Sequence, residues 1–260
     1  MFRKLNMNSF TLNPPFIMNL EQTADGSLTL YIPELDEHYH SVKGALTESM
    51  HIFIEMGLRH VHQQKQQIIQ GAQPQTTSLE TKSSETTSCI RLFEVGFGTG
   101  LNAFLTLMEA EALQRPVHYV SIERYPLGED VWGRLDYPAL IGRGHAGEFE
   151  ALHRAPWNED VRITPWFTLH KIEGDFTQQS FSAETYDLVY FDAFAPEKQP
   201  AMWSQPIFDA LHEALSSGGV LTTYCAKGVI RRMLQTAGFT VERLPGPPGG
   251  KREILRATKG

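Results

Sequence analysis

Strand-like and helix-like segments alternate along the chain from residue 89 to its end. Short apolar runs end in turns, and most are followed by a segment with apolar residues at helical spacing. Strands separated by helices favour parallel pairing, because a parallel connection has to cross the sheet. We therefore predict a Rossmann-like α/β fold, with helices on both faces of a mostly parallel sheet and an antiparallel last strand. The expected strands are 89–95, 117–123, 166–175, 186–192, 220–225, 240–244 and 252–258, and the expected helices are 101–113, 202–219 and 228–239.

The first 88 residues do not follow this alternation. Residues 27–32 are typical of a strand after a turn at Asp25-Gly26, and residues 44–62 have apolar side chains at helical spacing. The next segment is rich in Gln, Thr and Ser and too poor in apolar residues to pack into a core. We predict three parts: an α+β appendage at 1–62, a polar exposed insert at 63–88 and the Rossmann-like domain at 89–260.

Composition limits the cellular setting. The chain of 260 residues is 41% hydrophobic but has no apolar run long enough to span a membrane, so we expect no membrane span. Its start lacks the continuous apolar stretch of a signal peptide. The two cysteines, Cys89 and Cys225, have neither disulfide-framework nor metal-ligand spacing. These observations favour a reducing cytoplasm and a protein without a metal site.

The sequence FEVGFGTGLNAFL places three glycines between an apolar strand and an apolar helix. Gly96, Gly98 and Gly100 allow a ligand to approach the backbone closely. Their spacing is G-x-G-x-G, not the G-x-G-x-x-G of dinucleotide-binding folds. Glu94 stands just before the loop, where a carboxylate disfavours a diphosphate and favours a cation. We therefore include Glu94 among the cofactor-binding candidates.

Two further acids follow the next two strands. Glu123 is suited to accept hydrogen bonds from both hydroxyls of a ribose, and Asp175 to accept one from an exocyclic amine such as that of adenine. The carboxyl ends of parallel strands meet at one edge of a sheet, so these groups are expected to surround one ligand. A cation, a ribose and an adenine together describe S-adenosylmethionine better than a phosphate cofactor.

A fourth strand ends in YFDAFAPEKQPAMW, which places Asp192 at the mouth of the same cleft. The carboxylate of Asp192 can hold an amine, and the ring of Phe194 can stack on a base. This pattern indicates an acceptor that is planar and carries nitrogen. The alternative is that Asp192 only caps the helix that follows.

The net charge of −7 is unevenly distributed. From Lys227 to Gly260 there are eight basic and two acidic residues, so this segment carries +6 and the remainder of the chain −13. The segment is either a solvated face or a patch for an anionic partner. The candidate phosphate-binding residues are Lys227, Arg231, Arg232, Lys251 and Arg252.

These motifs resemble the methyltransferase of the MnmC/MnmD family. The resemblance rests on FEVGFGTGLNAFL, SIERYPL, IEGDF, YFDAFAPEKQPAMW, TYCAKGVIRRMLQTAGF and PGPPGGKREILRA, with YHSVKGALTESMHIFIE similar to the family's amino-terminal segment. The family methylates the aminomethyl group of a wobble uridine in tRNA, giving 5-methylaminomethyl-(2-thio)uridine. The resemblance implies tRNA as partner, Asp192 facing the transferred methyl group and the acceptor amine, and S-adenosylmethionine held by Gly96, Gly98, Gly100, Glu123 and Asp175.

Bifunctional members of that family continue into a flavin-dependent oxidase domain. The present sequence ends at Gly260 and has no second glycine-rich dinucleotide fingerprint. We therefore expect the stand-alone type, without FAD, which accepts an aminomethyl substrate made by separate enzymes. Asp192 is expected to recruit and orient the amine and to pass its proton towards water, with positioning supplying most of the rate.

Other classes fit part of the pattern. A small-molecule amine methyltransferase or an aminopropyltransferase would use the same cleft without a basic tail, and turnover without tRNA would favour it. A non-catalytic RNA-binding or adaptor protein on the same fold would be favoured by failure to bind S-adenosylmethionine. An NAD-dependent dehydrogenase would need the fingerprint that this sequence lacks.

Overall fold

The computed structural model describes residues 9–11, 17–71, 89–141 and 144–260. Its larger sheet is made of β5 (Ile90–Val95), β6 (Val117–Glu123), β7 (Asp160–Thr164), β8 (Phe167–Glu173), β9 (Tyr186–Phe191), β10 (Leu215–Thr223), β11 (Phe239–Pro245) and β12 (Glu253–Lys259). The spatial order is β11-β12-β10-β9-β5-β6-β8-β7. The strands from β10 to β8 pair in parallel, whereas β12 pairs antiparallel with both of its neighbours. The predicted Rossmann-like fold with an antiparallel last strand is confirmed.

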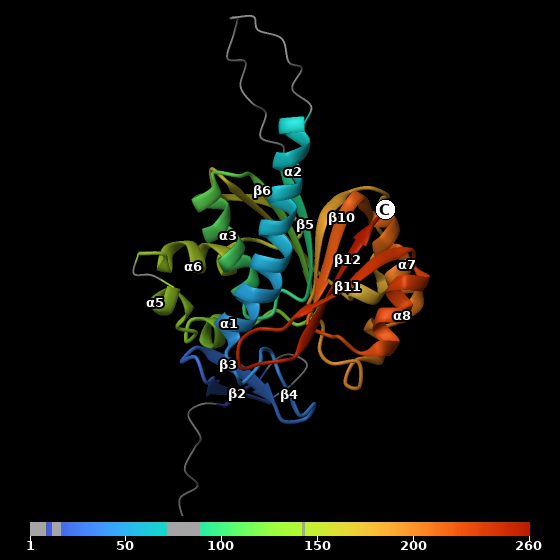
Figure 1. The fold of residues 1–260 in the computed structure, drawn as a ribbon. Helices are drawn as coiled ribbons and strands as arrows, with labels where there is room; N and C mark the ends of the chain where they lie inside the picture. The colour runs from blue at the N-terminus through green and yellow to red at the C-terminus, as the bar shows by residue number, and fades with distance from the viewer. Residues whose placement is uncertain (1–8, 12–16, 72–88, 142–143) are drawn as a thin grey trace, which may run out of the picture.

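Helices cover both faces of this sheet (Figure 1). The helices are α1 (Ala45–Ser49), the π-helical η1 (Met50–Arg59), α2 (His60–Gly71), α3 (Leu101–Leu113), α4 (Glu129–Trp132), α5 (Tyr137–Ile141), α6 (Ala146–Arg154), η2 (Phe176–Gln178), η3 (Pro200–Met202), α7 (Gln205–Ala214) and α8 (Gly228–Thr236). In β5, Ile90 and Leu92 face the core formed with η1, α3 and α6, whereas Phe93 and Val95 face the core formed with α7 and α8. This alternation arises because successive side chains of a strand point to opposite faces.

The amino-terminal part forms a second, antiparallel sheet and a long helix. The sheet contains β1 (Ser9–Thr11), β2 (Ile17–Gln22), β3 (Leu28–Ile32) and β4 (Glu37–His38) in that order. The helix runs continuously through α1, η1 and α2, and is longer than the predicted 44–62. It packs Phe53, Ile54 and Leu58 into the core of the larger sheet.

The predicted domain boundary at residue 62 stays a prediction. The helix before this boundary packs into the core of the larger sheet. The start of the predicted insert, 63–71, is the end of α2, and its remainder lies outside the described residues.

The largest differences from the sequence prediction concern α7, β10 and β7. The helix expected at 202–219 ends at Ala214, and β10 starts at once with Leu215. A register shift between Leu215 and Val220, with Gly218 at a φ of 74°, lets the Ser-Gly segment continue in the sheet. Strand β7 was not predicted, because it is a short, partly exposed edge strand in which only Val161 and Ile163 are apolar.

Within the described ranges, no helix combines the length and apolar character needed to cross a bilayer.

Candidate active site

The glycine loop between β5 and α3 adopts left-handed backbone angles at three positions. Gly96, Gly98 and Gly100 have φ angles of 90°, 52° and 73°. A Cβ on Gly98 would lie 3.1 Å from the ring of Tyr39, and one on Gly100 would lie 2.8 Å from Nε2 of His153. Side chains would therefore be strained and crowded at these two positions. Because glycine has no side chain, the loop fits between its neighbours at the edge of the sheet.

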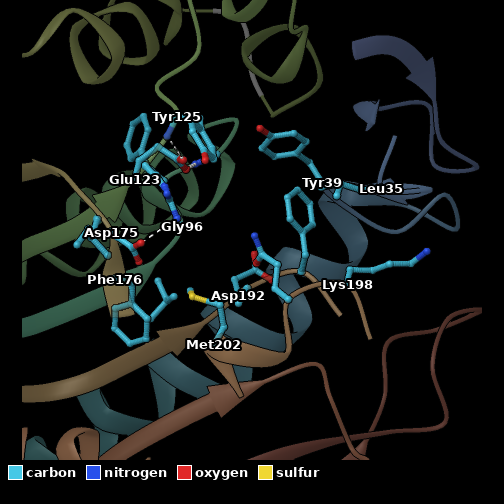
Figure 2. A pocket seen from close by; sticks show the side chains of 18 of the residues that line it. Leu35, Tyr39, Gly96, Glu123, Tyr125, Asp175, Phe176, Asp192, Lys198 and Met202 are labelled. Atoms are coloured by element: carbon cyan, nitrogen blue, oxygen red, sulfur yellow. Dashed lines mark hydrogen bonds and ion pairs between the residues drawn. The ribbon is translucent and has the colours of Figure 1, made fainter. Parts of the chain in front are cut away.

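A cavity of about 560 Å³ opens beside this loop, at the carboxyl ends of β5, β6, β8 and β9. Its volume is typical of a small-molecule site. Figure 2 shows Glu123 and Asp175 on one side of the cavity, Tyr39 on the opposite side and Asp192 below them. Of the predicted site residues, the cavity brings together Gly96, Gly98, Glu123, Asp175, Asp192 and Phe194.

Glu123 is held by two backbone amides, one from the glycine loop and one from the segment after β6. Its Oε2 accepts a hydrogen bond of 3.0 Å from the amide of Gly98, and its Oε1 accepts one of 2.8 Å from the amide of Tyr125. Burial raises the pKa of Glu123, and these hydrogen bonds oppose that rise by stabilising the carboxylate. Each oxygen keeps a further lone pair for a donor in the cavity.

Asp175 lies where β8 leads into η2. Its Oδ1 accepts hydrogen bonds of 2.9 and 2.7 Å from the amide and the hydroxyl of Thr177, and so caps η2. Its Oδ2 accepts one of 2.8 Å from Arg124. The Thr177 hydrogen bonds lower the pKa of Asp175. This carboxylate is therefore ionised and rigidly oriented in the cavity wall.

Asp192 follows β9 directly. Its Oδ2 accepts a hydrogen bond of 2.9 Å from the side-chain amide of Asn102, in the first turn of α3. Burial, together with the nearby carboxylate of Glu48, raises the pKa of Asp192 to about 7. A carboxylate with such a pKa accepts protons near neutral pH far better than an ordinary aspartate.

The segment after Asp192 is fixed by two hydrogen bonds to its backbone. Trp203 Nε1 donates to the carbonyl of Phe194 at 2.7 Å, and the hydroxyl of Tyr224 donates to the carbonyl of Ala193 at 2.9 Å. Phe194 meets Tyr39 edge to face, with ring centroids 5.2 Å apart. The cavity is therefore closed on one side by an aromatic pair from two distant segments.

Sequence reasoning missed Tyr39, Asn102 and Lys198, which all line the cavity. Asn102 could have been found from its position, because it follows the glycine loop at the start of a helix. The sequence around Tyr39 and Lys198 gives no comparable indication of a binding site. Tyr39 reaches the cavity only through the folding of the amino-terminal sheet.

Glu94 differs from its prediction. Its side chain is 1% exposed and is not part of the cavity lining. By strand alternation it shares the face of Ile90 and Leu92, beneath α3. Oε2 accepts a hydrogen bond of 2.7 Å from Ser121, and Oε1 is buried without a hydrogen-bond partner among the described residues. Burial raises the pKa of Glu94 to about 8. The structure therefore places this carboxylate inside the domain and outside the lining of the candidate cofactor cavity.

The basic residues predicted to bind phosphates lie outside the cavity lining. Two of them have acidic partners: Lys227 pairs with Glu197 and Lys251 with Glu48. The other three are Arg231, which is half-buried on α8, Arg232, which is exposed there, and Arg252, which is exposed just before β12. Their role in binding phosphates stays a prediction.

Similarity to known proteins agrees with this geometry. Residues 152–260 match the family model of an S-adenosyl-L-methionine-dependent methyltransferase. The tRNA 5-methylaminomethyl-2-thiouridine biosynthesis bifunctional protein MnmC of Cupriavidus metallidurans is 30% identical over 244 residues, 88% of this chain and 32% of that protein. MnmC of Pseudomonas entomophila is 29% identical over 234 residues, 85% of this chain and 32% of that protein. The chain thus spans about a third of the length of these relatives.

Solved structures extend the comparison to three dimensions. The crystal structure of MNMC2 from Aquifex aeolicus superposes with a TM-score of 0.69 at 25% identity, covering 94% of this chain and 70% of that one. Spermidine synthase from Thermotoga maritima superposes with a TM-score of 0.52 at 13% identity, covering 97% of this chain and 72% of that one. The second similarity concerns the fold alone.

The cavity suits the cofactor that the family model specifies. Glu123 and Asp175 offer carboxylate acceptors to the hydroxyls and the amine of a nucleoside, and Gly96 and Gly98 leave room beside the backbone. Fold, cavity and family match define an S-adenosylmethionine-dependent methyltransferase. Within that class the chain is similar to the methyltransferase part of MnmC proteins over most of its length, which confirms the resemblance seen in the sequence motifs.

Proposed function

We propose that this chain methylates the 5-aminomethyl group of a wobble (2-thio)uridine in tRNA, giving 5-methylaminomethyl-(2-thio)uridine. The observation that carries the proposal is the position of Asp192, a carboxylate with a pKa of about 7 at the cavity that also contains the glycine loop. Phe194 lies beside it and offers a ring to a planar base. The similarity to MnmC proteins supports tRNA as the substrate.

On the cofactor side, we assign the backbone of Gly96 and Gly98 to the amino-acid part of the ligand. Glu123 would accept hydrogen bonds from the ribose hydroxyls, and Asp175 would accept one from the adenine amine. Gly100 lies outside the cavity lining and would act by shaping the turn into α3. When bound, S-adenosylmethionine supplies a methyl group on a cationic sulfur, and the amine lone pair forms the N–C bond as the S–C bond breaks and leaves its electron pair on sulfur.

Asp192 would deal with the proton of the acceptor. An alkyl amine has a pKa of about 10.4 and is mostly protonated at neutral pH. Transfer of its proton to an ordinary aspartate, with a pKa of about 3.9, would cost roughly 9 kcal/mol. Transfer to Asp192, whose pKa is about 7, costs roughly half as much. The buried carboxylate would therefore take the ammonium proton and release it to water, leaving the lone pair free.

The substrate would reach the cavity from the surface that carries the arginines of α8 and of the connection before β12. Arg231, Arg232 and Arg252 would bind tRNA phosphates, with Lys227 available if its pair with Glu197 opens. Separate enzymes would make the aminomethyl precursor. Because it would act on tRNA, the protein would work in the cytoplasm.

Mass spectrometry of tRNA nucleosides tests the function. In a deletion strain we expect 5-aminomethyl-(2-thio)uridine to accumulate at the wobble position, and the purified protein with S-adenosylmethionine to convert it in isolated tRNA. An unchanged nucleoside profile would refute the proposal. Methylation of free amines without tRNA, or use of decarboxylated S-adenosylmethionine, would instead favour a small-molecule methyltransferase or an aminopropyltransferase.

A further inference from the structure

A charged pair from distant parts of the chain lies outside the cavity lining, close to Asp192. The Nζ of Lys251, in the connection between β11 and β12, donates to Oε1 of Glu48 in α1. The Oε2 of Glu48 accepts a hydrogen bond of 2.9 Å from the amide of Ser41. The Glu48 side chain is 11% exposed, so the charge of this carboxylate is only weakly screened by water.

This pair is connected to the segment that carries Asp192. The Nζ of Lys251 lies 4.5 Å from the ring centroid of Tyr224, at the end of β10. The Tyr224 hydroxyl donates to the carbonyl of Ala193, the residue after Asp192. Ion pair, ring and backbone contact therefore form one packed unit around the candidate catalytic carboxylate.

The two charges of the pair act on Asp192 in opposite directions. After burial itself, the negative charge of Glu48 is the main cause that raises the pKa of Asp192, whereas the positive charge of Lys251 lowers it. The hydrogen bond from Asn102 also lowers it. The net effect keeps the pKa of Asp192 close to neutral pH, where a group can both accept and release a proton.

We propose that Glu48 and Lys251 are positioning residues that set how readily Asp192 accepts a proton from the acceptor amine. This assignment rests on the proposed function of Asp192. It gives Lys251 a task inside the protein, because its ammonium group is already paired and is directed towards Glu48 instead of a phosphate. Neither residue needs to touch the substrate.

The other polar groups around Asp192 come from the strands and the helix packed against it. Among the described residues they include Glu94 on β5, Asn102 on α3, Tyr119 on β6 and Tyr224 just after β10. Burial raises the pKa of both tyrosines above their usual value, so they stay neutral near pH 7. Glu94, with a pKa of about 8, is the other group of this set that titrates nearby, and it is kept unchanged in the test.

The test is a titration of Asp192 in cofactor-free protein by carboxyl ¹³C NMR, with the signal assigned through Asp192→Asn. Glu48→Gln removes the negative charge and should lower the titration midpoint. Lys251→Met removes the positive charge and should raise it. We expect each shift to be on the order of 0.5 to 1 unit, as for one charge at partly screened distance. The double variant should return towards the wild-type midpoint.

The acid limb of kcat/KM for tRNA methylation should move in the same directions, because only ionised Asp192 accepts the proton. Lys251 is an exposed residue, so Lys251→Met is expected to fold, and its midpoint alone can support or overturn the inference if Glu48→Gln does not fold. Glu253→Gln is the matched control, since it breaks the pair with Arg243 on the same hairpin.

The inference would be overturned if the midpoints of Glu48→Gln and Lys251→Met did not move or moved in the same direction. An equal shift in the control Glu253→Gln would overturn it as well. Midpoints that shift while the acid limb stays in place would remove Asp192 as the proton acceptor. Because the NMR titration needs no tRNA, a protein inactive on tRNA would refute the proposed function separately.

Discussion

The side-chain amide of Asn102 donates a hydrogen bond of 2.9 Å to Oδ2 of Asp192. Asn102 stands in the first turn of α3, directly after the glycine loop, whereas Asp192 follows β9. One contact thus connects the loop proposed to hold the cofactor with the carboxylate proposed to meet the acceptor. A hydrogen bond to a charged partner is among the stronger ones in proteins, so it fixes the orientation of this carboxylate.

Replacement of Asp192 by Asn keeps the size of the side chain and removes its capacity to accept a proton. We expect single-turnover methylation at saturating tRNA to fall by about 10²- to 10⁴-fold, the usual contribution of a general base. Cofactor affinity, measured by calorimetry, should change little. Asp209→Asn, at a surface acid of α7 that does not line the cavity, is the control. A wild-type rate in Asp192→Asn would remove this residue from the chemistry.

Replacement of Glu123 by Ala removes the acceptor of the Gly98 and Tyr125 amides and of the proposed ribose contacts. Because hydrogen bonds to charged groups contribute about 1.5–3 kcal/mol, the Kd for S-adenosylmethionine should rise roughly 10- to 100-fold. Calorimetric titration measures the change. Glu173→Ala provides the comparison, since this exposed residue ends the neighbouring β8 but does not line the cavity. Equal affinities in the two variants would contradict the assignment.

Gly100 and Gly26 separate backbone strain from crowding. Both have positive φ, 73° and 88°, but only a Cβ on Gly100 would meet a neighbour, Nε2 of His153 at 2.8 Å. We expect Gly26→Ala to lower the free energy of unfolding by about 1 kcal/mol through strain alone. Gly100→Ala should lower it by a further 1–3 kcal/mol, roughly the range for overpacking. Urea denaturation measures both, and similar losses would show that His153 moves aside freely.

Glu94 should make the stability of the protein depend on pH. Its pKa is raised by burial from 4.5 to about 8, so between these values the folded protein holds a proton that the unfolded chain has released. The free energy of unfolding should therefore fall as pH rises through this range, at up to about 1.36 kcal/mol per unit from Glu94 alone. In Glu94→Gln this part of the fall should disappear, and the variant should gain stability relative to wild type at pH 8.5. Urea unfolding at pH 5.5 and 8.5 checks it; parallel losses in both proteins would contradict the buried, protonated state.

Arg231, Arg232 and Arg252 are expected to contribute to tRNA affinity through phosphates. The triple Ala variant should bind tRNA more weakly, and the slope of log Kd against log salt should decrease by about one unit per lost phosphate contact. Arg162→Ala controls for charge alone, because this exposed residue lies on β7, at the opposite edge of the sheet from β11. Equal salt slopes in the triple variant and wild type would exclude these three arginines as the residues that bind tRNA phosphates.

The sequence predicted the central strands and the glycine loop because their signals are local. Apolar runs such as that of β5, followed by three closely spaced glycines, specify a buried strand and a turn without reference to the rest of the chain. Glu123, Asp175 and Asp192 were found for the same reason, since parallel strands bring their carboxyl ends to one edge.

The remaining features depend on contacts between distant segments. Glu94 points to the same side of β5 as Ile90 and Leu92, which pack into the core beneath α3. Its position just before the loop does not indicate to which side of the strand it points. Tyr39 reaches the cavity through the folding of a separate sheet. The proton affinity of Asp192 depends on burial and on Glu48, 144 positions earlier in the sequence, so the local sequence does not reveal it.

The contact between Tyr39 and the glycine loop has a practical consequence for work with fragments. A chain that began at Cys89 would contain every glycine and acid of the predicted cofactor site, but it would lack Ile32, Leu35, Tyr39 and His40 from the cavity wall. It would also lose the long amino-terminal helix, which packs with α3 and α6 against one face of the larger sheet. The smallest fragment worth expressing for ligand binding therefore has to include β3 and, because it pairs with β3, β2 as well. Sequence variation in the amino-terminal sheet should be read as variation in the active site.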